Sequence, residues 1–121
     1  MSKRVMIVDD SLIVREMVSL TLGEAGFEVV AAGNGQDGLK KAEGQRLDLV
    51  ITDLNTPVMD GISLIRALRG LPGTKHTPIL MLTTESQVEK KMEGKAAGAT
   101  GWITKPFAPP KLLTVISKVL V

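Results

Sequence analysis

Five short, strongly apolar segments recur along the chain, and each is typical of a β-strand. They are Val5–Val8, Phe27–Ala31, Leu47–Ile51, Ile79–Leu82 and Gly101–Ile103. The segments between and after them place apolar residues three and four positions apart, which is the spacing of one buried helix face. The spacing is clearest near the end of the chain, at Leu112, Val115, Ile116 and Val119. Strand and helix alternate five times, which predicts an α/β domain built on a parallel sheet.

Glycines and prolines predict where several helices begin and end. Gly23 and Gly26 are expected to stop the helix after the first strand, because glycine often ends helices. Asp60-Gly61 is expected to start the helix after the third strand. Pro109-Pro110 predicts the first turn of the last helix, where a proline costs no hydrogen bond.

A weaker helix is expected over Ser86–Ala97. Gly94 lies inside this segment and lowers helix stability by about 1 kcal/mol relative to alanine. We therefore expect this helix to be the least stable one and to move in any conformational switch. The alternative is that Gly94 is simply tolerated near the helix end.

The strand order follows from the distribution of polar residues, because strands buried on both faces are continuously apolar. The first, third and fourth segments are continuously apolar, whereas Phe27–Val30 and Thr100–Thr104 are interrupted. This predicts a doubly wound, flavodoxin-like sheet of order 2-1-3-4-5 with helices on both faces. Order 3-2-1-4-5 would expose the apolar third strand. In the predicted order the chain reverses direction between strands 1 and 3, where open α/β sheets bind ligands at the carboxyl ends of strands.

Three carboxylates follow two strands that this order makes neighbours. Asp9 and Asp10 come after the first strand, and Asp53 comes after the third. At a separation of ~4 Å such charges repel by ~1 kcal/mol in water and by ~4 kcal/mol at a surface dielectric. A divalent cation would reverse this cost, and an all-oxygen ligand set favours a hard ion such as Mg²⁺. Asp10 or Ser11 could also cap the next helix, but capping leaves Asp53 unexplained.

The other strand ends add a hydroxyl and a cation to this edge of the sheet. Thr83-Thr84 follows the fourth strand and Lys105 follows the fifth. Together with the acidic cluster, these groups could hold a phosphoryl group and promote its transfer through positioning and charge neutralisation. A carboxylate can itself be the nucleophile and form an aspartyl phosphate. Asp53 is the best candidate, because it stands alone between the paired acids and the threonine and lysine side.

Composition narrows the possible functions. The 121 residues fit one domain, 1–121, and 44% hydrophobic residues exclude intrinsic disorder. With no cysteine and a single histidine, His76, the chain has no thiolate or histidine-rich metal site. A net charge of +2 and 2% aromatic residues give no support to nucleic-acid binding. Neither a signal peptide nor a membrane span is evident, so a cytoplasmic protein is expected.

Four motifs, in order and spacing, give the whole chain a specific resemblance to a known family. They are Val8–Ser11, Asp53–Gly61, Leu82–Glu85 and Gly98–Phe107. The chain resembles receiver domains of two-component response regulators, above all stand-alone chemotaxis receivers of the CheY type. This resemblance implies that Asp53 accepts a phosphoryl group from a histidine kinase.

The resemblance also implies a metal site. Asp10, Asp53 and the backbone carbonyl of Asn55 would hold Mg²⁺, with Asp9 placing a coordinated water. Asn55 and Glu85 occupy the two variable positions that tune water access to the phosphoaspartate in this family, and we expect a short-lived phosphoryl state.

Further implied roles concern the phosphoryl oxygens and the switch. Lys105 and Thr83 would bind the phosphoryl oxygens, and a cis peptide would precede Pro106. Thr83 and Trp102 occupy the two positions that move in the family's switch, although Trp102 replaces the usual tyrosine or phenylalanine and could merely cover the sheet edge. Thr56 stands where many receivers have methionine, and little consequence is expected.

We therefore expect a signalling switch with no output domain, whose phosphorylation changes the surface formed by the fourth helix, fifth strand and fifth helix. The expected partners are a chemotaxis histidine kinase, a target such as a flagellar motor switch protein, and a possible phosphatase, with neither nucleic acid nor membrane. The protein is expected to be a monomer and not an enzyme, apart from catalysing its own phosphorylation and dephosphorylation.

Other functions remain open at this stage. A phosphorelay shuttle or a phosphate sink would have the same site. Gly33–Gly38 matches a dinucleotide-binding pattern, but it follows an expected edge strand and the chain lacks a second nucleotide-binding half. A phosphatase using Asp53 lacks an evident general acid, because Asn55 stands two residues on.

Overall fold

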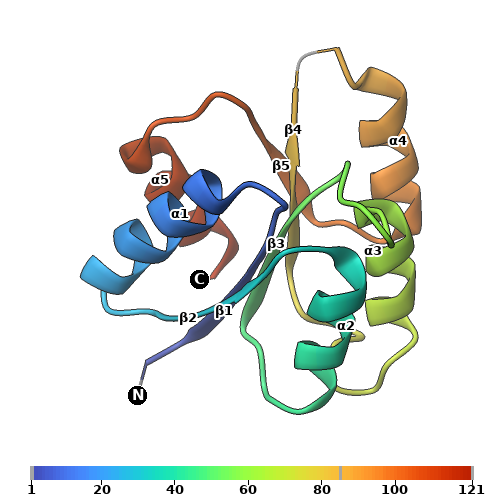
Figure 1. Cartoon of the computed structure of the whole chain (residues 1–121), viewed down its shortest axis with the longest axis horizontal. Coiled ribbons are helices and arrows are strands. Elements are labelled where there is room, and N and C mark those ends of the chain that lie inside the picture. The colour runs from blue at the N-terminus through green and yellow to red at the C-terminus, as the bar shows by residue number, and fades with distance from the viewer. Residues whose placement is uncertain (1, 85, 121) are drawn as a thin grey trace.

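The computed structural model describes residues 2–84 and 86–120. Within this part, five strands and five helices alternate along the chain (Figure 1). The strands are β1 (Arg4–Val8), β2 (Glu28–Ala32), β3 (Leu49–Asp53), β4 (Ile79–Thr83) and β5 (Gly101–Thr104). The helices are α1 (Leu12–Glu24), α2 (Gly35–Glu43), α3 (Gly61–Arg69), α4 (Val88–Ala97) and α5 (Pro109–Val119).

The sheet is fully parallel and has the predicted order β2-β1-β3-β4-β5. All residues of β3 and β4 are buried, whereas β2 and β5 are partly exposed. This confirms that the apolar segments form the centre of the sheet and the interrupted ones its edges. The pairing of Val8 with Thr52, and of Asp53 with Leu82, brings the carboxyl ends of the strands to one edge.

Two hydrophobic layers cover the sheet. α1 and α5 lie on one face, and α2, α3 and α4 lie on the other (Figure 1). Residues of β1 alternate between the layers, so Val5 and Ile7 face α1 and α5 while Met6 and Val8 face the opposite layer. Each fully buried aliphatic side chain contributes about 1.5–3 kcal/mol, which holds the layers together.

Side-chain caps fix the starts of three helices. Ser11, Asn34 and Asp60 each accept a hydrogen bond from the backbone N–H three residues on, at 3.2, 2.8 and 2.7 Å. Each cap is worth about 1 kcal/mol. The predicted starts at Asp60-Gly61 and Pro109 are confirmed. α4 has no side-chain cap.

Several predicted boundaries are wrong by one or two residues. The third strand runs over Leu49–Asp53 instead of Leu47–Ile51, so Asp53 is part of the strand. The first helix continues through Gly23 to Glu24, and Gly26 follows with a φ of 95°. The fourth helix begins at Val88 rather than Ser86, whose hydroxyl lies 3.0 Å from the Thr84 hydroxyl.

Gly94 is the buried residue of α4 and more than a propensity defect. A Cβ at this position would overlap the sulfur of Met81, which is fully buried on β4. The glycine therefore lets the helix backbone pack against the Met81 side chain. Whether α4 is the least stable helix stays a prediction.

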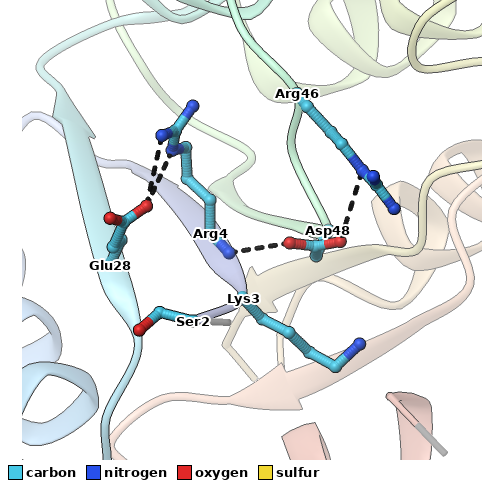
Figure 2. A pocket seen from close by; sticks show the side chains of 6 residues that line it. All are labelled: Ser2, Lys3, Arg4, Glu28, Arg46 and Asp48. Atoms are coloured by element: carbon cyan, nitrogen blue, oxygen red, sulfur yellow. Dashed lines mark hydrogen bonds and ion pairs between the residues drawn. The ribbon is translucent and has the colours of Figure 1, made fainter.

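The amino-terminal edge of the sheet carries paired charges (Figure 2). Arg4 pairs with Glu28 at 3.2 Å, and the backbone N–H of Arg4 donates to Asp48 at 2.8 Å. Arg46 lies 3.9 Å from the same aspartate. Exposed ion pairs of this kind contribute little to stability, about 0–1 kcal/mol each.

None of the helices in residues 2–84 and 86–120 combines the length and the hydrophobicity that a membrane span requires.

Candidate functional site

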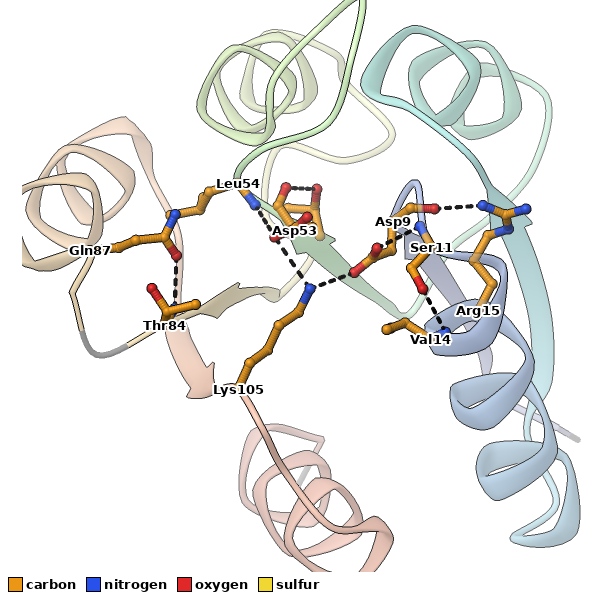
Figure 3. Close-up of polar contacts among 10 residues, drawn as sticks. Asp9, Ser11, Val14, Arg15, Asp53, Leu54, Thr84, Gln87 and Lys105 are labelled. Atoms are coloured by element: carbon orange, nitrogen blue, oxygen red, sulfur yellow. Dashed lines mark hydrogen bonds and ion pairs between the residues drawn. The ribbon is translucent and has the colours of Figure 1, made fainter.

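The carboxyl ends of four strands bring predicted site residues together. Figure 3 shows three of these residues, Asp9, Asp53 and Lys105, pointing toward one another. Asp9 follows β1, Asp53 ends β3, Thr83 ends β4 and Lys105 follows β5. Because the strands are parallel, these residues share one edge of the sheet, although Asp9 and Lys105 are 96 positions apart in the chain.

The three predicted carboxylates form a cluster. Each of Asp9, Asp10 and Asp53 offers an oxygen, and these oxygens lie within 4.8 Å of one another. Asp9 and Asp53 are buried, whereas Asp10 is exposed. This all-oxygen donor set suits Mg²⁺, which takes one or two carboxylates and keeps several waters. The residues present therefore fit the metal that the sequence predicts.

Lys105 lies between two of these carboxylates. Its Nζ donates to Asp9 Oδ2 at 2.9 Å and lies 3.6 Å from Asp53 Oδ1. The backbone N–H of Lys105 donates to the Thr83 carbonyl at 2.6 Å, which joins the ends of β4 and β5. The predicted cis peptide between Lys105 and Pro106 is present.

Burial changes the acidity of Asp53. Desolvation raises the pKa of this carboxyl above its usual value, and the nearby charge of Asp9 raises it further. Lys105 and the backbone N–H of Leu54, which donates to Asp53 Oδ1 at 2.9 Å, act in the opposite direction. The net effect is a raised pKa and a charged form that is poorly solvated, as suits a group that reacts as a nucleophile.

Asp9 is held by contacts that sequence reasoning missed. Its Oδ1 accepts from the Ser11 backbone N–H at 2.9 Å, and its carbonyl accepts from Arg15 Nη1 at 2.8 Å. Arg15 lies one helical turn after Ser11, so helical spacing from the cap could have pointed to it.

Thr83 supplies a hydroxyl with no partner. The side chain is fully buried, and its Oγ1 makes no hydrogen bond to any described residue. An unsatisfied buried polar atom costs about 1–3 kcal/mol. Such a hydroxyl is suited to donate to an oxygen that arrives with a ligand.

The loop between β3 and α3 is strained and clamped. Val58 has a φ of 69°, and Met59 N–H donates to the Pro57 carbonyl at 2.7 Å, forming a γ-turn. The Met59 carbonyl accepts from both the buried Thr56 hydroxyl and the Gly35 N–H. The Thr56 hydroxyl therefore joins the two ends of this loop, and the expectation that Thr56 has little consequence stays a prediction.

The close approach of Gly35 to the Met59 carbonyl also bears on the glycine-rich motif Gly33–Gly38. A Cβ on Gly35 would overlap the Met59 carbonyl, and one on Gly38 would lie 2.9 Å from Val8 Cγ2. Both glycines allow close backbone packing of α2. These contacts account for Gly35 and Gly38, two of the three glycines in the pattern, without a bound nucleotide.

The two predicted switch residues lie on neighbouring strands, Thr83 at the end of β4 and Trp102 on β5. Trp102 on β5 is 46% exposed, and the Lys91 ammonium lies 5.5 Å from its ring centroid. Its indole lines an open groove of about 530 Å³ together with Val88, Met92 and Lys95. The Asn55 side chain, at the first variable position, accepts from Lys90 on α4. Glu85, at the second, lies outside the described residues.

Comparison with protein families agrees with this geometry. The family profile described as response regulator receiver domain matches residues 5–117. The chain belongs to this receiver family. Receivers are signalling domains of two-component systems, which take a phosphoryl group from histidine kinases and bind Mg²⁺ at an acidic pocket.

Some relatives of this receiver match over nearly their whole length, and others over about half of it. The solved structure of Vibrio cholerae CheY4 is 51% identical with a TM-score of 0.95, over 99% of this chain and 100% of that one. Chemotaxis protein CheY of Pseudomonas aeruginosa is 35% identical, over 96% of this chain and 94% of that protein. In contrast, the chain matches 52% of the regulator PhoB from the same species, at 36% identity. The chain thus spans about half the length of the first curated relatives that it matches.

Proposed function

We propose that this receiver is a phosphorylation-activated switch in which Asp53 is the phosphoryl acceptor. The observation that carries the proposal is the meeting of the buried Asp53 carboxylate, the Lys105 ammonium and the unpartnered Thr83 hydroxyl at one edge of the sheet. A nucleophile, a cation and a free donor are the groups that phosphoryl transfer to a carboxylate requires.

In the proposed reaction, an oxygen of Asp53 attacks the phosphorus of a phosphohistidine. The new O–P bond forms as the P–N bond breaks, and the imidazole leaves with the electron pair. Lys105 neutralises charge on the phosphoryl oxygens once they displace its contact with Asp53, and the Thr83 hydroxyl donates to one of them. Hydrolysis by water returns Asp53 and inorganic phosphate.

Four residues would hold the metal in this proposal. Asp10, Asp53 and the Asn55 carbonyl would supply oxygens directly, and Asp9 would orient a water bound to the metal. Mg²⁺ supplies neutralisation of the negative charge that accumulates on the acids and the phosphoryl group.

The phosphodonor is a protein, a histidine kinase, in this proposal. Apolar side chains next to the site support this: Ile13, near the start of α1, is 79% exposed. Beside Lys105, a pocket of about 420 Å³ is lined by Val14, Met17 and Phe107 among others. An apolar rim beside a charged centre suits a protein surface better than a small phosphate ester.

We propose the surface of α4, β5 and α5 as the output face. Its groove combines the apolar Val88, Met92 and Trp102 with Lys91 and Lys95, which suits a target segment that is apolar and acidic. Similarity to chemotaxis receivers over nearly their whole length favours a flagellar motor switch protein as the target. A phosphorelay shuttle or phosphate sink remains the second candidate, because it would use the same site.

The test uses Asp53→Asn as the inactive control. Acetyl phosphate with Mg²⁺ should add one phosphoryl group to the wild type, detected by intact mass, and none to the variant. Beryllofluoride should change Trp102 fluorescence in the wild type alone. Absence of any adduct on the wild type would overturn the proposal.

A further inference from the structure

Lys90 connects the loop of the proposed metal site to the helix of the proposed output face. Its Nζ donates to Asn55 Oδ1 at 2.6 Å, across 35 positions of the chain. Lys90 lies in the first turn of α4, and Asn55 lies two residues after Asp53. The sequence does not predict this contact, because the two residues lie on different elements and no local spacing relates them.

We propose that Lys90 is a positioning residue that couples occupancy of the acidic site to the position of α4. The inference rests on the proposed function, since it takes the Asn55 carbonyl as a metal ligand. A ligand that fixes the Asn55 backbone also fixes where its side-chain amide lies. The hydrogen bond then transmits this position to the first turn of α4.

The two ends of α4 are attached very differently, which makes such transmission effective. At the carboxyl end, Arg69 Nε and Nη2 both donate to the Gly98 carbonyl, at 3.0 and 2.8 Å, and Lys95 donates to the Thr100 carbonyl. Gly94 is buried against Met81. Polar and packing contacts therefore pin this half of the helix to α3 and β4.

The amino-terminal half of α4 has fewer attachments. No described residue from Val88 to Glu93 is buried, and the helix start has no side-chain cap. Lys90 supplies the polar contact from this half to the acidic edge. A single exposed hydrogen bond is worth only about 0.5–1.5 kcal/mol. Among the described residues, the helix start is also joined to the end of β4, where the Thr84 N–H donates to Gln87 Oε1 at 2.7 Å.

The neighbouring residue extends the coupling to the output groove. Lys91 lies over the Trp102 ring, whereas Lys90 reaches Asn55. Successive helix residues point about 100° apart, so one turn of α4 contacts both the acidic edge and the groove. A displacement of Lys90 therefore shifts the Lys91 ammonium relative to the indole.

The experiment compares the wild type with Lys90→Met, which keeps the aliphatic stem but removes the donor. Lys90→Arg restores a donor, and Lys40→Met removes a positive charge from an exposed position on α2. Hydrogen exchange of the α4 amides is measured with and without saturating Mg²⁺ and beryllofluoride. A rise in melting temperature on adding Mg²⁺ and beryllofluoride shows separately that each variant binds them, that is, that it is loaded.

We expect loading to change exchange in the first turn of α4 at least fivefold in the wild type and in Lys40→Met. The change should fall below twofold in Lys90→Met and recover in Lys90→Arg. A full response in Lys90→Met, or no response in a loaded wild type, would overturn the coupling and leave the proposed function intact. Failure of the wild type to load at all would instead count against the proposed function.

Discussion

Replacing Gly94 with alanine sets two opposing effects against each other at one position of α4. Alanine favours the helix by about 1 kcal/mol relative to glycine. The new methyl group would, however, overlap the buried sulfur of Met81. Inserting a methyl group into a filled core costs about 1–3 kcal/mol. We therefore expect the free energy of unfolding to fall by about 0–2 kcal/mol.

A matched control comes from α1. Gly23 also lies inside a helix, but a Cβ there meets no atom within 4 Å. Gly23→Ala should therefore show the helix preference alone and stabilise the protein by about 0.5–1 kcal/mol. Urea denaturation, with free energies extrapolated to water, measures both variants.

A double-mutant cycle with Met81→Ala separates the overlap from the helix preference. Met81→Ala alone should cost about 2–5 kcal/mol, because it leaves a cavity beneath α4. In that background Gly94→Ala should become stabilising, which gives a coupling energy of about 1–3 kcal/mol. The reasoning is refuted if Gly94→Ala stabilises the wild type as much as Gly23→Ala does.

Three further predictions concern the acidic site and its loop. Because the folded protein raises the pKa of Asp53, its charged form destabilises the fold at neutral pH; this penalty should shrink as pH falls through the raised pKa and disappear below the ordinary value. Without metal, Asp53→Asn should be more stable than the wild type at pH 7, with the difference shrinking as pH falls in urea titrations; a constant difference across pH would contradict the stated cause. Mg²⁺ at a hundredfold its dissociation constant should stabilise the wild type by about 2.7 kcal/mol in thermal denaturation, reversibly with a chelator, and should stabilise Asp53→Asn less. Thr56→Val should cost about 1–2 kcal/mol, because the Met59 carbonyl loses a donor, whereas Thr56→Ser should retain most of the stability in the same assay.

Hydrophobic patterning was sufficient to predict the fold of this chain. The order of the strands followed from the polar interruptions in the second and fifth segments, because the sheet buries the other three on both faces. Asp9, Asp53 and Lys105 could be expected to meet because parallel strands bring their carboxyl ends together.

The remaining features depend on tertiary distances that no local pattern carries. The role of Gly94 arises from Met81 on another element, and that of Gly35 from the Met59 carbonyl. Whether the Thr83 hydroxyl has a hydrogen-bond partner depends on how the surrounding side chains pack, and among the described residues it has none. These facts become visible only after the layers are packed.

Because Arg69 holds the Gly98 carbonyl, α4 can tilt about its carboxyl end. With its carboxyl end fixed, the helix has an arm of ~12 Å between Gly98 and Lys90, at 1.5 Å per residue. A displacement of ~1 Å at the free end then tilts the helix by about 5° and moves Val88 much more than Lys95. A target that binds around Val88 would distinguish the two states of the switch. A target that binds beside Lys95 would bind both states almost equally.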